Sequence, residues 1–120
     1  MNTFSFLILL SLCTYMAFAS FACGNDQLQQ GFAESIVKND CKGRLGNVNA
    51  CCSRHTRCYE KGVEQKTCDD NFCKCAEKAA KKLPGCSLHM TNFCVTARTF
   101  GGLNYLSAKA KRDQKKPKVL

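Results

Sequence analysis

The residues of this chain best suited to acid–base chemistry are a histidine and an aspartate, His55 and Asp69. His55 lies between two cysteines seven residues apart, in the segment Cys51–Cys58, and Asp69 lies in a second such segment, Cys68–Cys75. Seven residues make about two turns of an α-helix, so both cysteines of each segment lie on one helix face. The spacing therefore predicts two helices that each carry a titratable side chain beside their cysteines.

The register of these two helices follows from the short, polar connection between them, residues 60 to 67, which contains Gly62. Such a connection suits antiparallel helices. In an antiparallel pair, residues that face each other have position numbers with a constant sum. Cys51 with Cys75 and Cys58 with Cys68 give the same sum, so we predict these two disulfides.

This register brings His55 opposite residues 69 to 72. A carboxylate there can accept the imidazole N–H, hold one tautomer and support the imidazolium that forms when His55 takes a proton. Tyr59 lies one turn beyond His55 and can donate its hydroxyl to the same carboxylate. The pattern predicts a catalytic pair, His55 and Asp69, with Tyr59 as a supporting hydrogen-bond donor.

The run Cys-Cys-Ser-Arg-His-Thr-Arg-Cys-Tyr at residues 51–59 resembles the signature helix of the secreted phospholipases A2, Cys-Cys-x-x-His-Asp-x-Cys-Tyr. Cys68-Asp69, followed by Cys75, resembles their second helix. The resemblance covers roughly residues 23 to 94 and is closest to the compact branch without the β-hairpin insertion and to small secreted nematode members. It implies sn-2 ester hydrolysis of phospholipids, in which the histidine activates a water molecule and calcium polarises the ester.

One position departs from the signature, because Thr56 stands where the active family members carry the aspartate that binds calcium. Calcium takes six to eight oxygen ligands, and a neutral hydroxyl replaces a bidentate carboxylate poorly. Residues 41–49 are expected to form a loop, in which the family's glycine-rich calcium loop is reduced to Gly43 and Gly46. The resemblance thus implies a degenerate calcium site with these three possible remnants. The cofactor is calcium if the protein is active, and otherwise none.

Two functions follow from this departure, and both stay open. One is a secreted phospholipase A2-like enzyme whose catalysis is weak or lost. The alternative is a non-catalytic, cationic protein on the same scaffold that binds membranes or a protein receptor. Whether the protein is an enzyme is therefore undecided at this stage.

The N-terminal residues 1–22 contain no Lys, Arg, Asp or Glu, and their apolar run, residues 4 to 12, is too short to span a bilayer. This predicts a cleaved signal peptide and a secreted, extracellular protein. An uncleaved anchor is the alternative. Residues 23–106 then form the phospholipase A2-like domain.

Ten cysteines remain in residues 23–120, and this density in an exported chain predicts a disulfide framework. A zinc site is the competing use of cysteine and histidine, but a paired Cys-x-x-Cys is absent. We predict a third bridge, Cys41–Cys52. Three connectivities remain open for the other four cysteines, which are Cys23, Cys73, Cys86 and Cys94.

The expected fold class is all-α and disulfide-rich, with the two cross-linked antiparallel helices and a short N-terminal helix within residues 23–40. Leu28, Phe32, Ile36 and Val37 form one face of that helix. It covers the core, and in the family it also lines the lipid channel. The second cross-linked helix is expected to continue to Pro84, and a last short helix to break at Gly101.

The chain is basic, with a formal net charge of +9. Residues 107–120 hold six basic residues and one acidic residue and are expected to be a disordered tail. Such charge favours an anionic phospholipid membrane surface as partner, and export argues against nucleic acid. Solvated charge without a partner is the alternative. The sequence does not indicate an oligomeric state.

Overall fold

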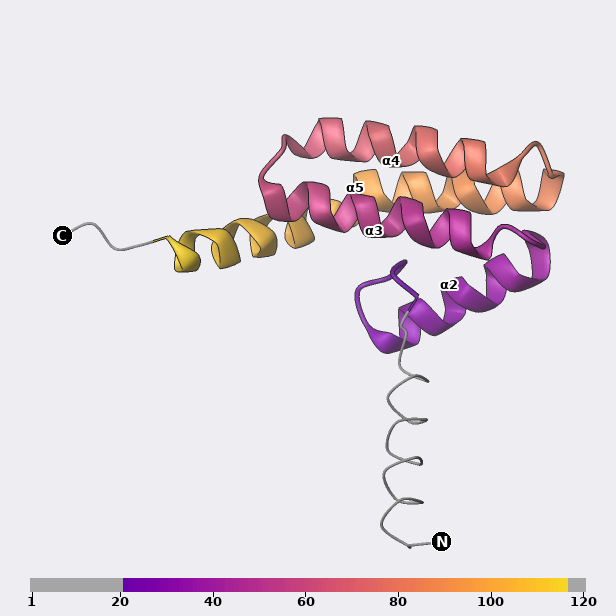
Figure 1. The fold of residues 1–120 in the computed structure, drawn as a ribbon, viewed down its shortest axis with the longest axis horizontal. Coiled ribbons are helices and arrows are strands. Elements are labelled where there is room, and N and C mark those ends of the chain that lie inside the picture. Colours follow the sequence, from indigo (N-terminus) through magenta and orange to yellow (C-terminus); the bar gives the residue numbers. More distant parts are fainter. Residues whose placement is uncertain (1–20, 117–120) are drawn as a thin grey trace, which may run out of the picture.

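The computed structural model describes residues 21–116, which form four helices: α2 (Gln27–Asp40), α3 (Leu45–Lys61), α4 (Gln65–Ala80) and α5 (Pro84–Lys115). Figure 1 shows α3, α4 and α5 side by side, with α2 packed below them. The described residues contain no strand, and five disulfides connect the helices. The all-α, disulfide-rich fold class is confirmed.

Helices α3 and α4 form the antiparallel pair that positions the predicted catalytic residues. The bridges Cys51–Cys75 and Cys58–Cys68 connect them, as their register predicts. Gly62 ends α3 with φ of 80°, a left-handed conformation that a glycine adopts without steric cost. Only three residues then separate the helices, so the chain reverses within one turn.

Two further bridges, Cys23–Cys52 and Cys73–Cys94, connect this pair to its neighbours, and Cys41–Cys86 connects the end of α2 to α5. The predicted Cys41–Cys52 bridge is wrong. Residues 41–49 were expected to be a loop, but α3 already begins at Leu45. Seven helical residues therefore hold Cys52 roughly 10 Å from the start of α3, beyond the reach of a disulfide with Cys41.

Helix α4 ends earlier than expected, at Ala80, because Lys81 and Lys82 adopt left-handed conformations with φ of 47° and 60°. Pro84 does not stop a helix but starts α5, at the first helical position, where proline is well tolerated. Helix α5 then continues unbroken for 32 residues through Gly101. The expected break at that glycine is therefore wrong.

The predicted tail is helical rather than disordered over residues 107–115, while residues 117–120 lie outside the described part. The physical reason is packing on α3, where the Tyr59 and Tyr105 rings meet edge to face with centroids 5.2 Å apart. Arg112 also donates to the backbone carbonyl oxygens of Tyr59 and Glu60. These contacts stabilise the helix over residues 107–115, which composition alone predicts to be disordered.

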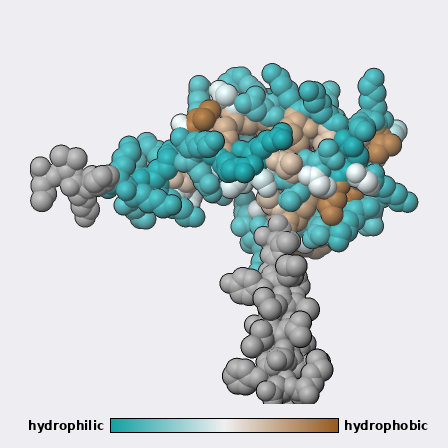
Figure 2. Space-filling model, viewed as in Figure 1, coloured by the Kyte–Doolittle hydropathy of each residue, from teal (hydrophilic) through white to brown (hydrophobic). Residues whose placement is uncertain are grey.

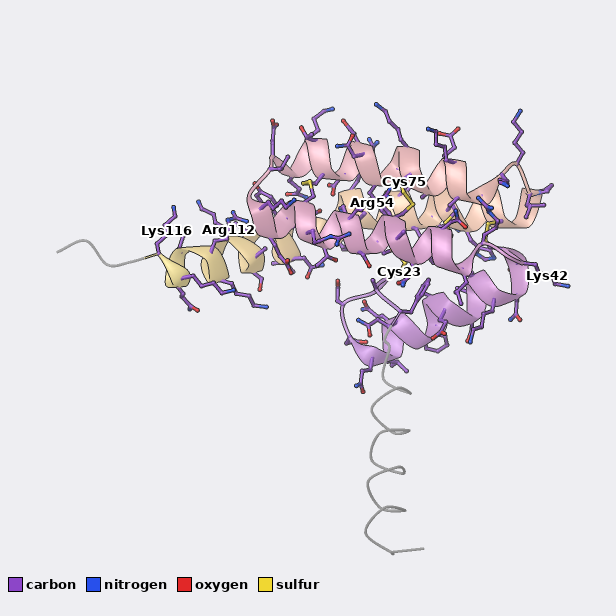
Figure 3. All side chains as sticks on the ribbon, in the orientation of Figure 1. Cys23, Lys42, Arg54, Cys75, Arg112 and Lys116 are labelled. Atoms are coloured by element: carbon purple, nitrogen blue, oxygen red, sulfur yellow. A yellow bond between two sulfur atoms is a disulfide. The ribbon has the colours of Figure 1, made fainter. Side chains whose placement is uncertain are left out.

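The core is small and rich in sulfur, as the side chains in Figure 3 show. Its largest fully buried side chains are Met90, Val37 and Val48, together with cysteines of the bridges. Leu28 and Phe32 of α2 were expected to cover the core, but both are exposed. Figure 2 shows brown and tan patches on an otherwise hydrophilic surface.

The predicted signal peptide falls almost wholly outside the described residues. Of its 22 residues only Phe21 and Ala22 are described. Phe21 is buried in the core, and the backbone N–H of Ala22 donates to the side-chain oxygen of Asn49 at 2.7 Å. Within residues 21–116, no helix is long and apolar enough to cross a membrane.

Candidate functional site

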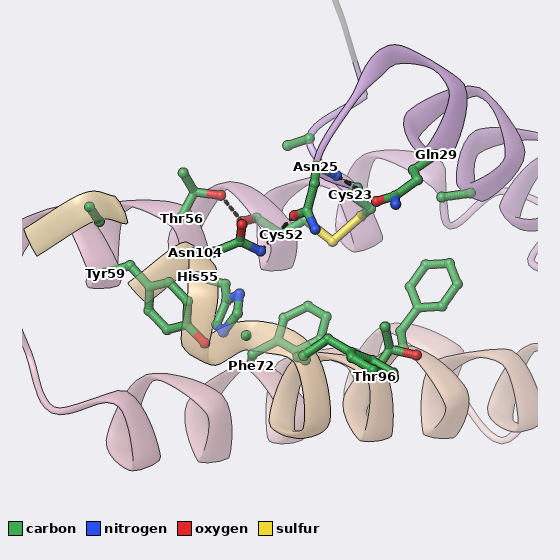
Figure 4. A pocket seen from close by; sticks show the side chains of 18 of the residues that line it. Cys23, Asn25, Gln29, Cys52, His55, Thr56, Tyr59, Phe72, Thr96 and Asn104 are labelled. Atoms are coloured by element: carbon green, nitrogen blue, oxygen red, sulfur yellow. Dashed lines mark hydrogen bonds between the residues drawn. A yellow bond between two sulfur atoms is a disulfide. The ribbon is translucent and has the colours of Figure 1, made fainter. Parts of the chain in front are cut away.

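His55 lies in the middle of α3, on the face directed toward α4 and α5. Its ring sits between two aromatic rings, with centroid separations of 4.4 Å to Tyr59 and 4.8 Å to Phe72. Figure 4 shows this group of rings at the base of a pocket. The rings of Tyr59 and Phe72 therefore pack on the two sides of the His55 imidazole and fix its orientation.

Asp69, on α4, accepts hydrogen bonds from both residues that the register places opposite it. Its Oδ1 lies 2.7 Å from His55 Nε2 and 2.5 Å from the Tyr59 hydroxyl. The carboxylate is 4% exposed, so these bonds are sheltered from water. Because the carboxylate accepts, Nε2 carries the hydrogen in neutral His55, and the lone pair is left on Nδ1.

The Tyr59 hydroxyl remains a donor to Asp69 far into the alkaline range. Burial raises the pKa of Tyr59 most, and the hydrogen bond to the Asp69 carboxylate adds to the effect. Both causes disfavour the phenolate, which would bring a second negative charge beside the first. Tyr59 therefore keeps its proton, and its hydrogen bond to the Asp69 carboxylate, at neutral and mildly alkaline pH.

Two residues of this network were not predicted from the sequence. Gln65, one turn before Asp69 on α4, donates from Nε2 to Asp69 Oδ2 at 3.4 Å. Gly101 of α5 lies directly against the Tyr59 hydroxyl, where an added Cβ would overlap the oxygen atom. The i to i+4 spacing of Gln65 and Asp69 is a local signal that could have indicated the role of Gln65. No local signal indicates the contact between Gly101 and Tyr59, since this contact depends on how α5 crosses α3.

The pocket beside His55 has a volume of about 610 Å³ and is bounded by α2, α3, α4 and α5. Its wall is largely apolar, and its size is in the range of small-molecule sites. Phe32 of α2 and Phe100 of α5 both line it and are exposed. The apolar lining side chains include Phe32, Ala33, Ile36, Phe72, Phe93, Ala97 and Phe100.

Thr56 also lines this pocket, one residue after His55, but its hydroxyl is already bonded within its own helix. Thr56 Oγ1 donates to the carbonyl oxygen of Cys52 at 3.2 Å (Figure 4). The nearby Asn25 oxygen accepts from Asn104 at 2.7 Å. Glu60 supplies the single carboxylate of the lining. Calcium takes six to eight oxygen ligands, with carboxylates among them. The Thr56 hydroxyl is already bonded and position 56 carries no carboxylate, so this donor set does not fit the ion.

The structure does not bring the two predicted glycine remnants to the site. Gly43 lies in the turn between α2 and α3, and Gly46 lies inside the first turn of α3. Nine helical residues separate Gly46 from His55, a rise of roughly 13 Å. The segment beside Thr56 is instead Ala22–Asn25, which the Cys23–Cys52 bridge attaches to α3. No group of three or more His, Cys, Asp or Glu in the described residues is arranged to hold a metal ion.

A curated protein of Caenorhabditis elegans, named as a phospholipase A2-like protein, is 34% identical to this chain over 84 residues. The chain is similar to this phospholipase A2-like protein. The aligned part covers 69% of this chain but 48% of the relative, so the chain spans about half the relative's length. No protein-family model matches the sequence. No solved structure matches the fold described above.

Proposed function

We propose that the protein is a secreted lipid-binding protein whose pocket holds an acyl chain of a phospholipid beside His55. The observation that carries this proposal is the apolar pocket beside His55, whose lining includes the exposed side chains of Phe32 and Phe100. A volume of about 610 Å³ leaves room for part of one lipid, and the apolar wall favours its hydrocarbon. Five disulfides in a small domain support export.

The network around His55 retains the proton chemistry of ester hydrolysis. Neutral His55 has its lone pair on Nδ1 and can take a proton from a water molecule that attacks the sn-2 ester. Asp69 orients the ring and stabilises the imidazolium, and Tyr59 holds the carboxylate in place. The same proton can then pass from Nδ1 to the leaving alkoxide.

No group of described residues is arranged to hold a metal ion that would stabilise the oxyanion formed in this attack. Removal of a single oxyanion donor typically slows an enzyme by ~10²–10³. Thr56 does not replace the missing charge, since its hydroxyl already donates to Cys52. We therefore propose that hydrolysis is weak or lost, and that lipid binding is the main activity of the pocket.

Lipid hydrolysis by the secreted protein, with and without calcium, tests the catalytic half of this proposal. We expect little hydrolysis in the unmodified protein and calcium-dependent hydrolysis in Thr56→Asp. Thr91→Asp is the matched control, because Thr91 is exposed on a helix and makes the same bond, to the Ser87 carbonyl at 3.0 Å. Rapid hydrolysis in the unmodified protein that disappears in His55→Gln would overturn the proposal.

Binding of a fluorescent fatty acid in solution tests the other half. Ala97 lines the pocket on α5, so Ala97→Phe fills part of it and should weaken binding at least tenfold. The matched control is Ala110→Phe on an exposed part of the same helix, which should bind normally. Equal binding by both variants would place the ligand elsewhere.

The second candidate function is a non-catalytic, cationic protein that binds membranes or a protein receptor without using the pocket. The formal charge of +9 favours it. Membrane binding that Ala97→Phe leaves normal, together with no fatty-acid binding by the unmodified protein, would support this candidate.

A further inference from the structure

The last part of α5, residues 103–116, extends past the ends of α3 and α4 as a helical arm (Figure 1). We call it the C-terminal arm. It contains five basic residues and one acidic residue, and the acidic residue, Asp113, lies 3.9 Å from the Lys116 ammonium group. Figure 3 shows Arg112 and Lys116 on this arm. The arm therefore presents concentrated positive charge away from the body of the protein.

The arm has a fixed direction because one of its faces is attached to α3. Arg112 places its guanidinium at the C-terminal end of α3 and donates to the carbonyl oxygens of Tyr59 and Glu60, the latter at 3.2 Å. A cation is favourable there, since the helix dipole and unpaired carbonyls make this end negative. Gly62 leaves space for the guanidinium, as a Cβ at that position would lie 3.0 Å from Arg112 Cζ.

The opposite face of the arm is apolar and exposed. Leu103 and Leu106 are 79% and 61% exposed, and with Ala110 they fall within about 60° of one another around the helix. Lys109 lies on one side of this strip and Lys111 on the other, each about 100° from its centre. Exposed leucines between lysines are typical of helices that lie in a lipid interface, where the leucines enter the apolar layer.

We propose that the C-terminal arm docks on an anionic lipid surface, with Leu103 and Leu106 inserted and the lysines near lipid phosphates. The charge of the arm is complementary to such a surface, and the leucines suit a lipid interface better than a soluble polyanion. Lys111 also lines the pocket beside His55, so docking brings the pocket close to the lipid. This docking does not need an occupied pocket and so goes beyond the proposed function.

Flotation with vesicles of phosphatidylcholine, alone or with one third phosphatidylglycerol, tests the proposal on the full secreted protein. We expect binding to the anionic vesicles only, falling as salt is added. Lys109→Gln with Lys116→Gln should weaken it about 30-fold, since each lysine near the surface contributes about 1 kcal/mol. Leu103→Ser with Leu106→Ser should weaken it about tenfold.

Two control variants separate the arm from the rest of the molecule. Leu88 is 62% exposed on the same helix, 18 residues or five full turns before Leu106, so Leu88→Ser removes an equally exposed leucine from the same helix face. Lys74→Gln with Lys78→Gln removes two exposed charges from α4. We expect both to bind as tightly as the unmodified protein.

Three outcomes would overturn the proposal. Leu88→Ser could weaken binding as much as the arm leucines do, or neutral vesicles could bind as well as anionic ones. Heparin or RNA could bind the arm tightly with no effect of the leucine substitutions, which would make it a site for soluble polyanions. Fatty-acid binding without vesicles reports the pocket separately, so loss of vesicle binding alone contradicts the arm and leaves the proposed function standing.

Discussion

Gly101 lets α5 pass over the Tyr59 hydroxyl, and we expect Gly101→Ala to destabilise the protein for this reason. A Cβ at this position would overlap the hydroxyl oxygen, whereas the ring carbon that carries the hydroxyl would be 3.5 Å away, in ordinary contact. The hydroxyl cannot rotate aside without losing its 2.5 Å bond to buried Asp69. The whole conflict therefore rests on one oxygen atom.

The size of the effect follows from two opposing terms. Overpacking a core site typically costs about 1–3 kcal/mol, and alanine is favoured over glycine in a helix by about 1 kcal/mol. Gly101→Ala should thus lower the free energy of unfolding by up to about 2 kcal/mol. In a Tyr59→Phe background the oxygen is gone, and the same substitution should stabilise by about 1 kcal/mol. The coupling between the two positions is then about 1–3 kcal/mol.

Denaturant unfolding of the four proteins of this cycle, with disulfides intact, measures the coupling. Gly102→Ala is the matched control, since its Cβ would meet nothing closer than Gln65 Oε1 at 3.9 Å. It should stabilise both backgrounds by about 1 kcal/mol. Equal effects of Gly101→Ala with and without the Tyr59 hydroxyl would refute the contact between α5 and the site.

Three further predictions concern titration and the arm. Because the pKa of Tyr59 is raised, its stabilising contribution is complete below pH ~10 and lost above it, so the unmodified protein and Tyr59→Phe should develop equal tyrosinate absorbance near pH 10. An extra tyrosinate in the unmodified protein at that pH would count against this. The hydrogen bond from Lys66 lowers the pKa of Asp70, so Asp70→Asn should reduce stability near neutral pH, and the reduction should shrink as the pH is lowered toward 2. A loss that is equal at the two pH values would be evidence of a steric effect instead. Arg112→Ala should increase amide hydrogen exchange over residues 109–115, and unchanged protection would show that the arm is ordered without its attachment to α3.

Short-range spacing predicts the α3–α4 pair because both of its bridges follow from one register. The bridges of Cys23, Cys41 and Cys52 could not be predicted in this way, since they depend on how α2 and α5 pack against that pair. His89 illustrates the same limit. Its Nε2 lies 2.6 Å from Asp40, 49 residues earlier, because the Cys41–Cys86 bridge brings the end of α2 to the start of α5.

The candidate site, too, could be predicted from the sequence only in part. His55, Tyr59 and Asp69 meet because they belong to the two helices whose register the sequence contains. The pocket wall from α5 was missed, since composition predicts a helix break at Gly101 and tertiary contacts override that preference. The glycine remnants were assigned to the wrong segment because the early start of α3 was not apparent in residues 41–49.

The most direct test of acyl-chain binding beside His55 is an NMR titration of the protein carrying ¹³C-labelled alanine methyl groups. Ala33 and Ala97 line the pocket, while Ala76 and Ala79 are buried in the core outside it. A short-chain lysophospholipid added below its micelle concentration should shift the first two methyl signals and leave the last two unchanged. Saturable shifts confined to Ala33 and Ala97 are the predicted result. Shifts spread evenly over all four, or none at a concentration that fills other lipid-binding proteins, would contradict the account.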